Sequence, residues 1–195
     1  MKNLFIISSI LFSIISFSQI RIGDKTITSN PDLTNSVSVL LEFGDTKDKG
    51  IILPYVETVP SGTNNAKGGT FIFDVSSNSE YKIKVKNENT GWTDLSVQSG
   101  YSNAVETIVK NPQASPLADK ADAKIVIGAE SSSTDGILVL ESVLNNRAMI
   151  LPIVENYNSI KNPSPGMMAF LRSTIDSSKH RLIVFNGQKW SFWKP

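Results

Sequence analysis

The segment IILPYVE, residues 51–57, returns almost unchanged as MILPIVE, residues 149–155. Each copy is a short aliphatic run that ends in a Leu-Pro pair, and neither copy contains a catalytic motif. Proline has no backbone N–H, so within a sheet it is confined to a strand end, a bulge or an edge strand. The repetition therefore predicts an apolar β-strand, built twice, that must stop or bend at Pro54 and Pro152.

Five further landmarks also occur twice in the same order. Each is short, rich in aliphatic and aromatic residues, and bounded by turn-forming residues, as is typical of β-strands. The pairs are IRIG and IVIG, VLLE and LVLE, GGTFIFD and PGMMAFL, YKIKVKN and HRLIVFN, and finally Trp92 and Trp190. Six landmarks in one order indicate a duplicated unit of about 70 residues.

The spacing inside each unit predicts β-hairpins. Residues 81–86 alternate apolar and lysine side chains as a half-buried strand does, and turn residues join them to the strand at 69–75. The stretch STIDSSK, residues 173–179, joins the equivalent strands of the second unit. Asn186-Gly187 then signals a tight turn before the last strand.

These patterns predict an all-β fold of two tandem small antiparallel β modules, built from hairpins and joined by a linker. We assign residues 1–18 to a signal peptide, 19–96 to repeat one, 97–123 to the linker and 124–195 to repeat two. The linker mixes Ser, Ala, Pro, Asp and Lys with little apolar periodicity, which is typical of an extended or partly flexible segment. Within it, residues 104–110 are long enough for about two helical turns.

The N-terminus predicts export. Lys2 precedes an apolar run at 4–15, and Ser16-Phe17-Ser18 places small residues at a signal-peptidase site. The run is shorter than the membrane span of about 20 residues, so no transmembrane segment is expected in the mature chain. The mature protein is predicted to be secreted, with the periplasm, the exterior and the cell surface all left open.

Composition argues against several classes of function. Because the chain has no cysteine, it has no disulfides and no thiolate metal sites. The 19 basic and 18 acidic residues form no basic block, so no nucleic-acid binding is expected. His180 is the only histidine and aligns with Tyr81, at what we interpret as a core-facing strand position. We predict no catalytic residues, no metal site, no cofactor and no enzymatic activity.

Carboxylates supply the remaining candidates for chemistry. Glu42 and Glu57 recur as Glu141 and Glu155, and duplication favours ion pairing at strand ends over the asymmetric tuning that an acid and a base require. The run at 45–50, DTKDKG, superficially resembles a calcium loop but carries two lysines and lacks the alternating oxygen ligands.

The landmarks carry a family resemblance. Residues 49–54, 163–166 and 185–190 match the KG-x-x-LP, Pro/Gly and NG-x-x-W segments of a short repeat in exported and surface proteins of Bacteroidetes. Their strand–turn–Trp endings are also similar, more weakly, to modules of phage tail fibres. The resemblance implies a structural role and, by analogy, a fibre-like or trimeric arrangement, and it implies no chemistry.

The two units differ on their outward faces. Lys84 and Lys86 of repeat one align with apolar residues of repeat two, as does Asp74, so the last hairpin of repeat two is apolar on both faces. A strand that is apolar on both sides needs cover, and an exposed patch of this kind marks an interaction surface. The candidate interaction surface comprises Leu171, Ile183, Phe185, Phe192 and Trp193.

We therefore expect a secreted, non-enzymatic structural, adhesive or assembly protein of the cell envelope or surface. Its expected partner is itself, as a homo-oligomer such as a trimer bound through the C-terminal repeat, or another envelope protein. The alternative is a carbohydrate- or other ligand-binding module that uses exposed aromatics such as Trp193 or Tyr101. The sequence predicts no particular ligand, partner or biological process.

Overall fold

The computed structural model describes residues 20–23, 39–43, 48–61, 66–111, 124–134, 136–141 and 148–193. The predicted signal peptide lies outside these residues, and so do residues 112–123 of the predicted linker. The described elements are short β-strands with a single α-helix among them, which confirms the predicted all-β fold class.

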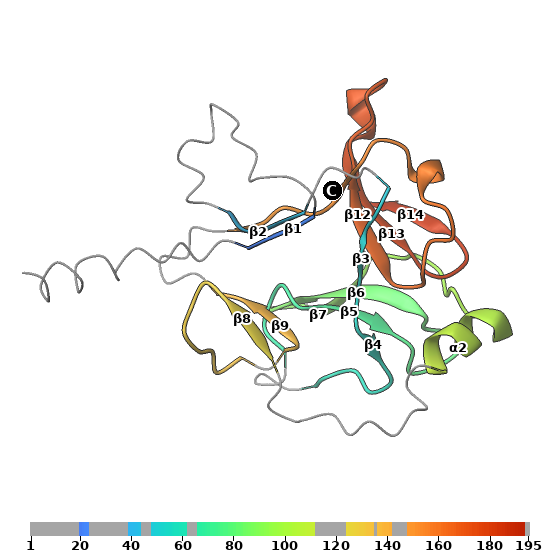
Figure 1. Ribbon diagram of the computed structural model, residues 1–195. Helices are drawn as coiled ribbons and strands as arrows, with labels where there is room; N and C mark the ends of the chain where they lie inside the picture. The colour runs from blue at the N-terminus through green and yellow to red at the C-terminus, as the bar shows by residue number, and fades with distance from the viewer. Residues whose placement is uncertain are drawn as a thin grey trace, which may run out of the picture.

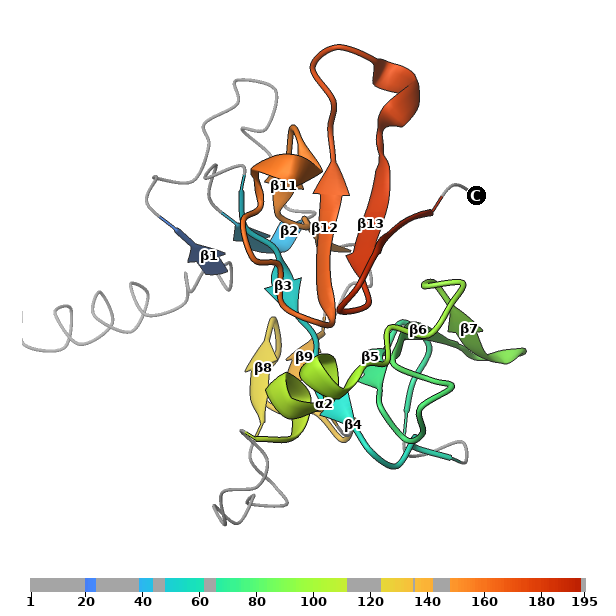
Figure 2. The ribbon, with the colours of Figure 1, turned by 90° about the vertical axis from the view of Figure 1, so that its right-hand side faces the viewer.

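Each repeat contributes one antiparallel hairpin sheet, and the two sheets form the body of the molecule (Figures 1 and 2). The N-terminal sheet has the order β4-β5-β6-β7, and the C-terminal sheet has the order β11-β12-β13-β14. The predicted hairpins are confirmed, since Phe71 lies opposite Val85 and Met168 lies opposite Val184. The strands are β4 (Tyr55–Val56), β5 (Phe71–Asp74), β6 (Lys82–Asn87), β7 (Gly91–Asp94), β11 (Ile153–Val154), β12 (Met167–Leu171), β13 (Arg181–Phe185) and β14 (Trp190–Trp193).

Parallel strand pairs surround these hairpins. In each repeat a two-residue strand runs parallel to the first hairpin strand, as β4 does beside β5 and β11 beside β12. The N-terminal strands β1 (Ile20–Ile22) and β2 (Val39–Phe43) are parallel, and so are β8 (Ile125–Ile127) and β9 (Leu138–Leu140). The purely antiparallel modules expected from the sequence are thus wrong in this respect, because hairpin signals report only pairings between neighbouring segments.

The Leu-Pro segment is where a strand leaves one sheet for another. Strand β3 (Ile51–Ile52) pairs with β12 of the C-terminal sheet, and after Pro54 the chain continues as β4 of the N-terminal sheet (Figure 1). The carbonyl of Pro54 accepts a 2.9 Å hydrogen bond from Phe73 N–H, and Pro152 accepts one of the same length from Phe170. The strand therefore ends before each proline, as the sequence predicted, and the proline carbonyl in addition joins the next ladder.

The two repeats exchange strands. Strand β3 of repeat one pairs with repeat two, and its counterpart β10 (Ala148–Met149) pairs in parallel with β2 of repeat one. The main core also combines both halves, since Met168 and Val184 pack with Phe73 and Ile83. The described parts of the two repeats are consequently joined through this main core.

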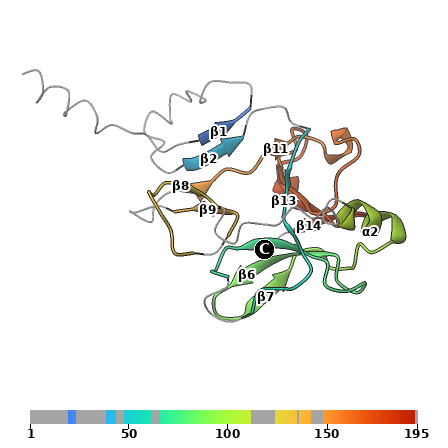
Figure 3. The same cartoon turned by 60° about the horizontal axis from the view of Figure 1, so that its bottom comes forward.

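The predicted linker begins as folded structure. Helix α2 (Asn103–Lys110) lies beside both hairpin sheets (Figures 1 and 3). Its N-cap is Ser102, whose hydroxyl accepts a 3.2 Å hydrogen bond from Val105 N–H, as is usual at helix starts. Val105 and Val109, one turn apart, are buried in the shared core. The helix agrees with the two helical turns for which residues 104–110 are long enough, whereas the extended or partly flexible character expected of the linker is wrong for residues 103–110.

Candidate interaction surface

Three of the five residues predicted for the interaction surface are interior. Leu171, Ile183 and Phe185 are 5%, 0% and 9% exposed, so the prediction that they line a surface is wrong. The cover comes from the connection between β11 and β12, which contains the 3₁₀ turn η2 (Tyr157–Ser159). This second core comprises Val154, Ile160, Met167, Ala169, Leu171, Ile183 and Phe185, with Tyr157 and Trp190 packed against it.

The other two predicted residues remain at the surface. Phe192 and Trp193 are 40% and 42% exposed, and both belong to β14 at the end of the C-terminal sheet. The ring of Phe192 packs edge-to-face on Tyr157, with 5.0 Å between centroids, and the ring of Trp193 has no such aromatic partner among the described residues. Residues Trp190–Trp193 therefore combine a sheet edge with exposed aromatic rings, and we call them the aromatic edge.

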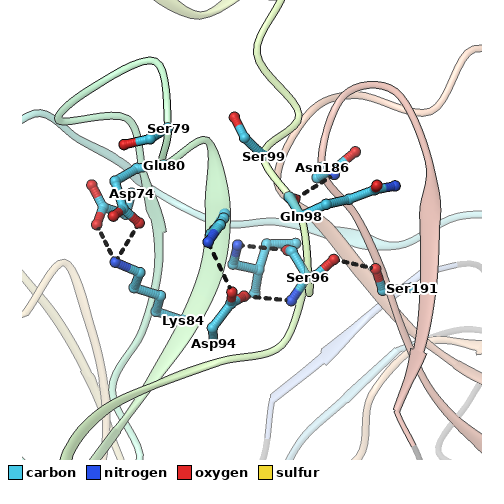
Figure 4. Close-up of polar contacts among 12 residues, drawn as sticks. Asp74, Ser79, Glu80, Lys84, Asp94, Ser96, Gln98, Ser99, Asn186 and Ser191 are labelled. Atoms are coloured by element: carbon cyan, nitrogen blue, oxygen red, sulfur yellow. Dashed lines mark hydrogen bonds and ion pairs between the residues drawn. The ribbon is translucent and has the colours of Figure 1, made fainter.

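The corresponding face of repeat one carries charges in place of this second core. Lys84 donates to Asp74 Oδ2 at 2.7 Å and lies 2.6 Å from Glu80 Oε2 (Figure 4). Burial raises the pKa of the Asp74 carboxyl, but hydrogen bonds from Lys84 and Ser76 outweigh it and hold the pKa below its ordinary value. Burial likewise lowers the pKa of the Lys84 ammonium, and its two carboxylate partners raise it above the ordinary value.

A polar contact joins the two hairpin sheets. Ser191 donates to the carbonyl of Ser96 at 2.7 Å, and the Asn186 amide donates to the carbonyl of Gln98 at 2.9 Å (Figure 4). Ser96 and Asn186 are buried, and Ser96 also accepts a 2.8 Å bond from Ile83 N–H. The contact leaves no room at Gly100, where a Cβ would lie 1.7 Å from the carbonyl oxygen of Asn186.

Sequence reasoning missed this junction. Asn186 was recognised as a turn residue, and its carboxamide oxygen does accept from Gln188 and Lys189 N–H in that turn. Its amide group has the second role of contacting residue 98, which is 88 positions away. No local signal in the sequence reports such a contact, because residues 97–123 have the composition of a loop.

Other residues singled out by the sequence have structural surroundings. His180 is exposed next to β13 and lies 3.0 Å from the carbonyl of Ser173, so the expected core-facing position is wrong. Tyr101 is half-buried against Tyr81, and its hydroxyl, which has one hydrogen to donate, lies 3.1 Å from Asn103 Oδ1 and 3.2 Å from Glu106 Oε2. The indole of Trp92 donates to Pro60 O at 3.3 Å, as expected for a ring that closes its module.

The described ranges contain neither a group of three or more His, Asp or Glu placed to hold a metal ion nor a helix that is long and apolar enough to cross a membrane. Of the run at 45–50, only residues 48–50 are described, where Lys49 lies 3.9 Å from Asp48.

No protein family, curated protein or solved structure matches this chain. The fold and the surface thus define it as an all-β protein of short strands with exposed aromatics on one sheet edge.

Proposed function

We propose that this protein is a secreted, non-enzymatic structural, adhesive or assembly component of the cell envelope, and that it self-associates through its C-terminal repeat. The observation that carries the proposal is the aromatic edge. An edge strand presents unpaired backbone groups to any chain that can continue the sheet, and natural proteins usually protect such edges. Here β14 instead exposes two large aromatic side chains.

A second copy is the simplest partner for the aromatic edge. Two antiparallel β14 strands related by a two-fold axis would extend the sheet across both copies. Phe192 and Trp193, which are successive residues on opposite faces of the sheet, would then each lie beside side chains of the other copy. Aromatic residues are enriched in the buried centre of such interfaces, where they supply a large part of the binding energy.

The test is the mass of the mature chain, residues 19–195, in solution. The wild-type protein is expected to exceed the monomer mass by size-exclusion chromatography with light scattering, and the double variant Phe192→Lys/Trp193→Lys is expected to lose mass. Ile175→Lys is the matched control, because Ile175 is an aliphatic residue that is 96% exposed in the turn between β12 and β13. A folded double variant with the wild-type mass would refute the proposed role of β14.

Export is tested separately. The expected mature N-terminus is Gln19, which mass spectrometry of the protein recovered from the periplasm or medium of expressing cells would detect. An unprocessed chain retained in the cytoplasm would contradict the secreted role without affecting the test of self-association.

Carbohydrate binding is the second candidate, and the exposed ring of Trp193 favours it. Sugar rings stack on exposed aromatic faces, so a glycan array should give signals that Trp193→Ala abolishes and Tyr101→Ala leaves intact. Tyr101 is the contrasting variant because its ring packs against Tyr81. Binding that survives Trp193→Ala would exclude this surface as the glycan site.

A further inference from the structure

In each repeat a short strand precedes the Leu-Pro pair. The two copies of this strand form backbone hydrogen bonds through opposite edges. In repeat one, Leu53 N–H donates to Gly166 O at 3.1 Å. In repeat two, Ile150 N–H donates to Leu41 O at 2.9 Å, and Ile150 corresponds to Ile52, the residue before Leu53. Successive backbone N–H groups of a strand point to opposite edges. Each copy of the strand therefore uses the edge that the other leaves open.

The receiving strands show the same complementarity. Strand β12 accepts β3 beside Met167 and Met168, and the corresponding residues of repeat one are Thr70, directly before β5, and Phe71, the first residue of β5. Likewise, β2 lies between β1 and β10, whereas its counterpart β9 pairs only with β8. Within the described ranges, no strand occupies the second edge of β9 or the edge of β5 at residues 70–71.

Burial differs at these equivalent positions. Gly166 and Gly69 both have positive φ, and their N–H groups make matching 2.9 Å bonds to the next hairpin strand. Gly166 is buried, and a Cβ there would meet Phe73 at 3.1 Å and Tyr55 at 3.3 Å. Gly69 is exposed, and a Cβ there would have no neighbour within 4 Å. Repeat one therefore buries Gly166 of repeat two, whereas Gly69, the equivalent residue of repeat one, is exposed to solvent.

The parallel strands differ in the same direction at two of three equivalent positions. Leu41 of β2, which has a neighbour on each side, is 0% exposed, whereas its counterpart Leu140 of β9 is only partly buried. Leu138 of β9 is 47% exposed, whereas its counterpart Val39 of β2 is partly buried. A strand that is paired on one edge only and carries exposed aliphatic side chains is a candidate site for pairing with a further strand.

We propose that chains assemble head to tail by repeating, between copies, the strand exchange that joins the two repeats within one chain. Strand β10 of one copy adds antiparallel to residues 70–71 of the next copy, and β3 of that next copy adds in parallel to β9 of the first. The occupant of each open edge is a second copy, because this chain carries both strands that fit. The contact joins unlike surfaces, so it generates a ring or an open fibre. This inference rests on self-association but needs nothing from the aromatic edge.

Cysteine cross-linking tests this register directly, since the chain has no cysteine of its own. Met167 lies opposite Ile52 within the chain, so the equivalent contact between copies places Thr70 opposite Ile150. Paired residues of antiparallel strands have Cα atoms about 4.5–5.5 Å apart, within the range of a disulfide. Oxidised Thr70→Cys/Ile150→Cys is expected to give a ladder of covalent dimers and higher species on a non-reducing gel.

Two controls make the outcome decisive. Ile52→Cys/Met167→Cys is expected to form a disulfide within one chain and to stay monomeric on the gel. The single variants Thr70→Cys and Ile150→Cys are expected to cross-link when mixed and not when oxidised alone, because head-to-tail contact joins unlike positions. A mixture that stays monomeric, or single variants that dimerise as readily alone, would overturn the proposal. Adding Phe192→Lys/Trp193→Lys separates the two interfaces, since the ladder should survive that change.

Discussion

The buried charges of repeat one offer a quantitative test of the equivalence between the two repeats. Asp74 and Lys84 correspond to Leu171 and Ile183, so repeat two already contains an apolar version of this face. We predict that Lys84→Ile alone is strongly destabilising, because it leaves the Asp74 carboxylate, 1% exposed, without its cation. Loss of one partner of a buried pair costs about 3–5 kcal/mol.

The single variant Asp74→Leu and the double variant complete a double-mutant cycle with wild-type and Lys84→Ile. Asp74→Leu alone should cost less than Lys84→Ile, since Lys84 keeps Glu80 at 2.6 Å. The double variant Asp74→Leu/Lys84→Ile should return to within about 1 kcal/mol of wild-type or exceed it, because apolar replacement of a buried ion pair is often neutral or stabilising. Glu80 then loses its partner but is partly exposed and can turn toward water.

Urea unfolding followed by tryptophan fluorescence measures all four proteins, with the free energy obtained by linear extrapolation. The decisive quantity is the coupling energy of the cycle. A double variant as unstable as Lys84→Ile would refute the reasoning, because it would mean that this face requires a charge pair and is not equivalent to the apolar face of repeat two.

Three further predictions concern the same fold. The pKa of Asp74 in the folded protein lies below its ordinary value. The contribution of the Asp74 carboxylate to stability is therefore complete above about pH 4 and is lost as the pH falls through the lowered pKa. The stability of wild-type should consequently fall more steeply with acid than that of Asp74→Leu. Gly100→Ala should cost at least about 3 kcal/mol through its clash with the Asn186 backbone, while Gly136→Ala, with its nearest neighbour at 3.5 Å, should be nearly neutral in the same urea assay. Val109→Ala should cost about 2 kcal/mol by opening the shared core beneath α2, and Ile108→Ala, at an exposed helix position, should change the unfolding free energy by less than about 0.5 kcal/mol.

Local patterns in the sequence predicted the local parts of the fold. The alternation at 81–86 and the turn residues at 173–179 identified both hairpins, because adjacent strands need only a suitable turn and a matched apolar face. The Leu-Pro pairs correctly marked where a strand ends, since proline removes a donor wherever it stands. Strand exchange was outside the reach of this reasoning: β3 and β10 are two residues long, and nothing in so short a segment specifies a distant partner.

The candidate surface shows the limit of reading faces from one strand. The apolar character of Ile183 and Phe185 was evident, but the choice between an exposed patch and a covered core depended on residues 155–166. A signal was present in Ile160 and Tyr157, two apolar residues within a polar connection that has no strand of its own. The position of that connection over β12 and β13 determines that Leu171, Ile183 and Phe185 are buried. Of the five candidate residues, Phe192 and Trp193 are therefore the two that remain exposed.

Backbone and side chains agree to different extents between the two predicted repeats. The carbonyls of both prolines accept bonds of equal length, and both positive-φ glycines donate equally to the next strand. The faces above these ladders differ completely, with an ion pair in one repeat and a second core in the other. Two units can differ in the side chains on their faces and still pair through the same strand edges, because edge pairing uses only backbone groups. The strand edges therefore remain interchangeable between the repeats, which is the property that exchange between two copies of the chain requires.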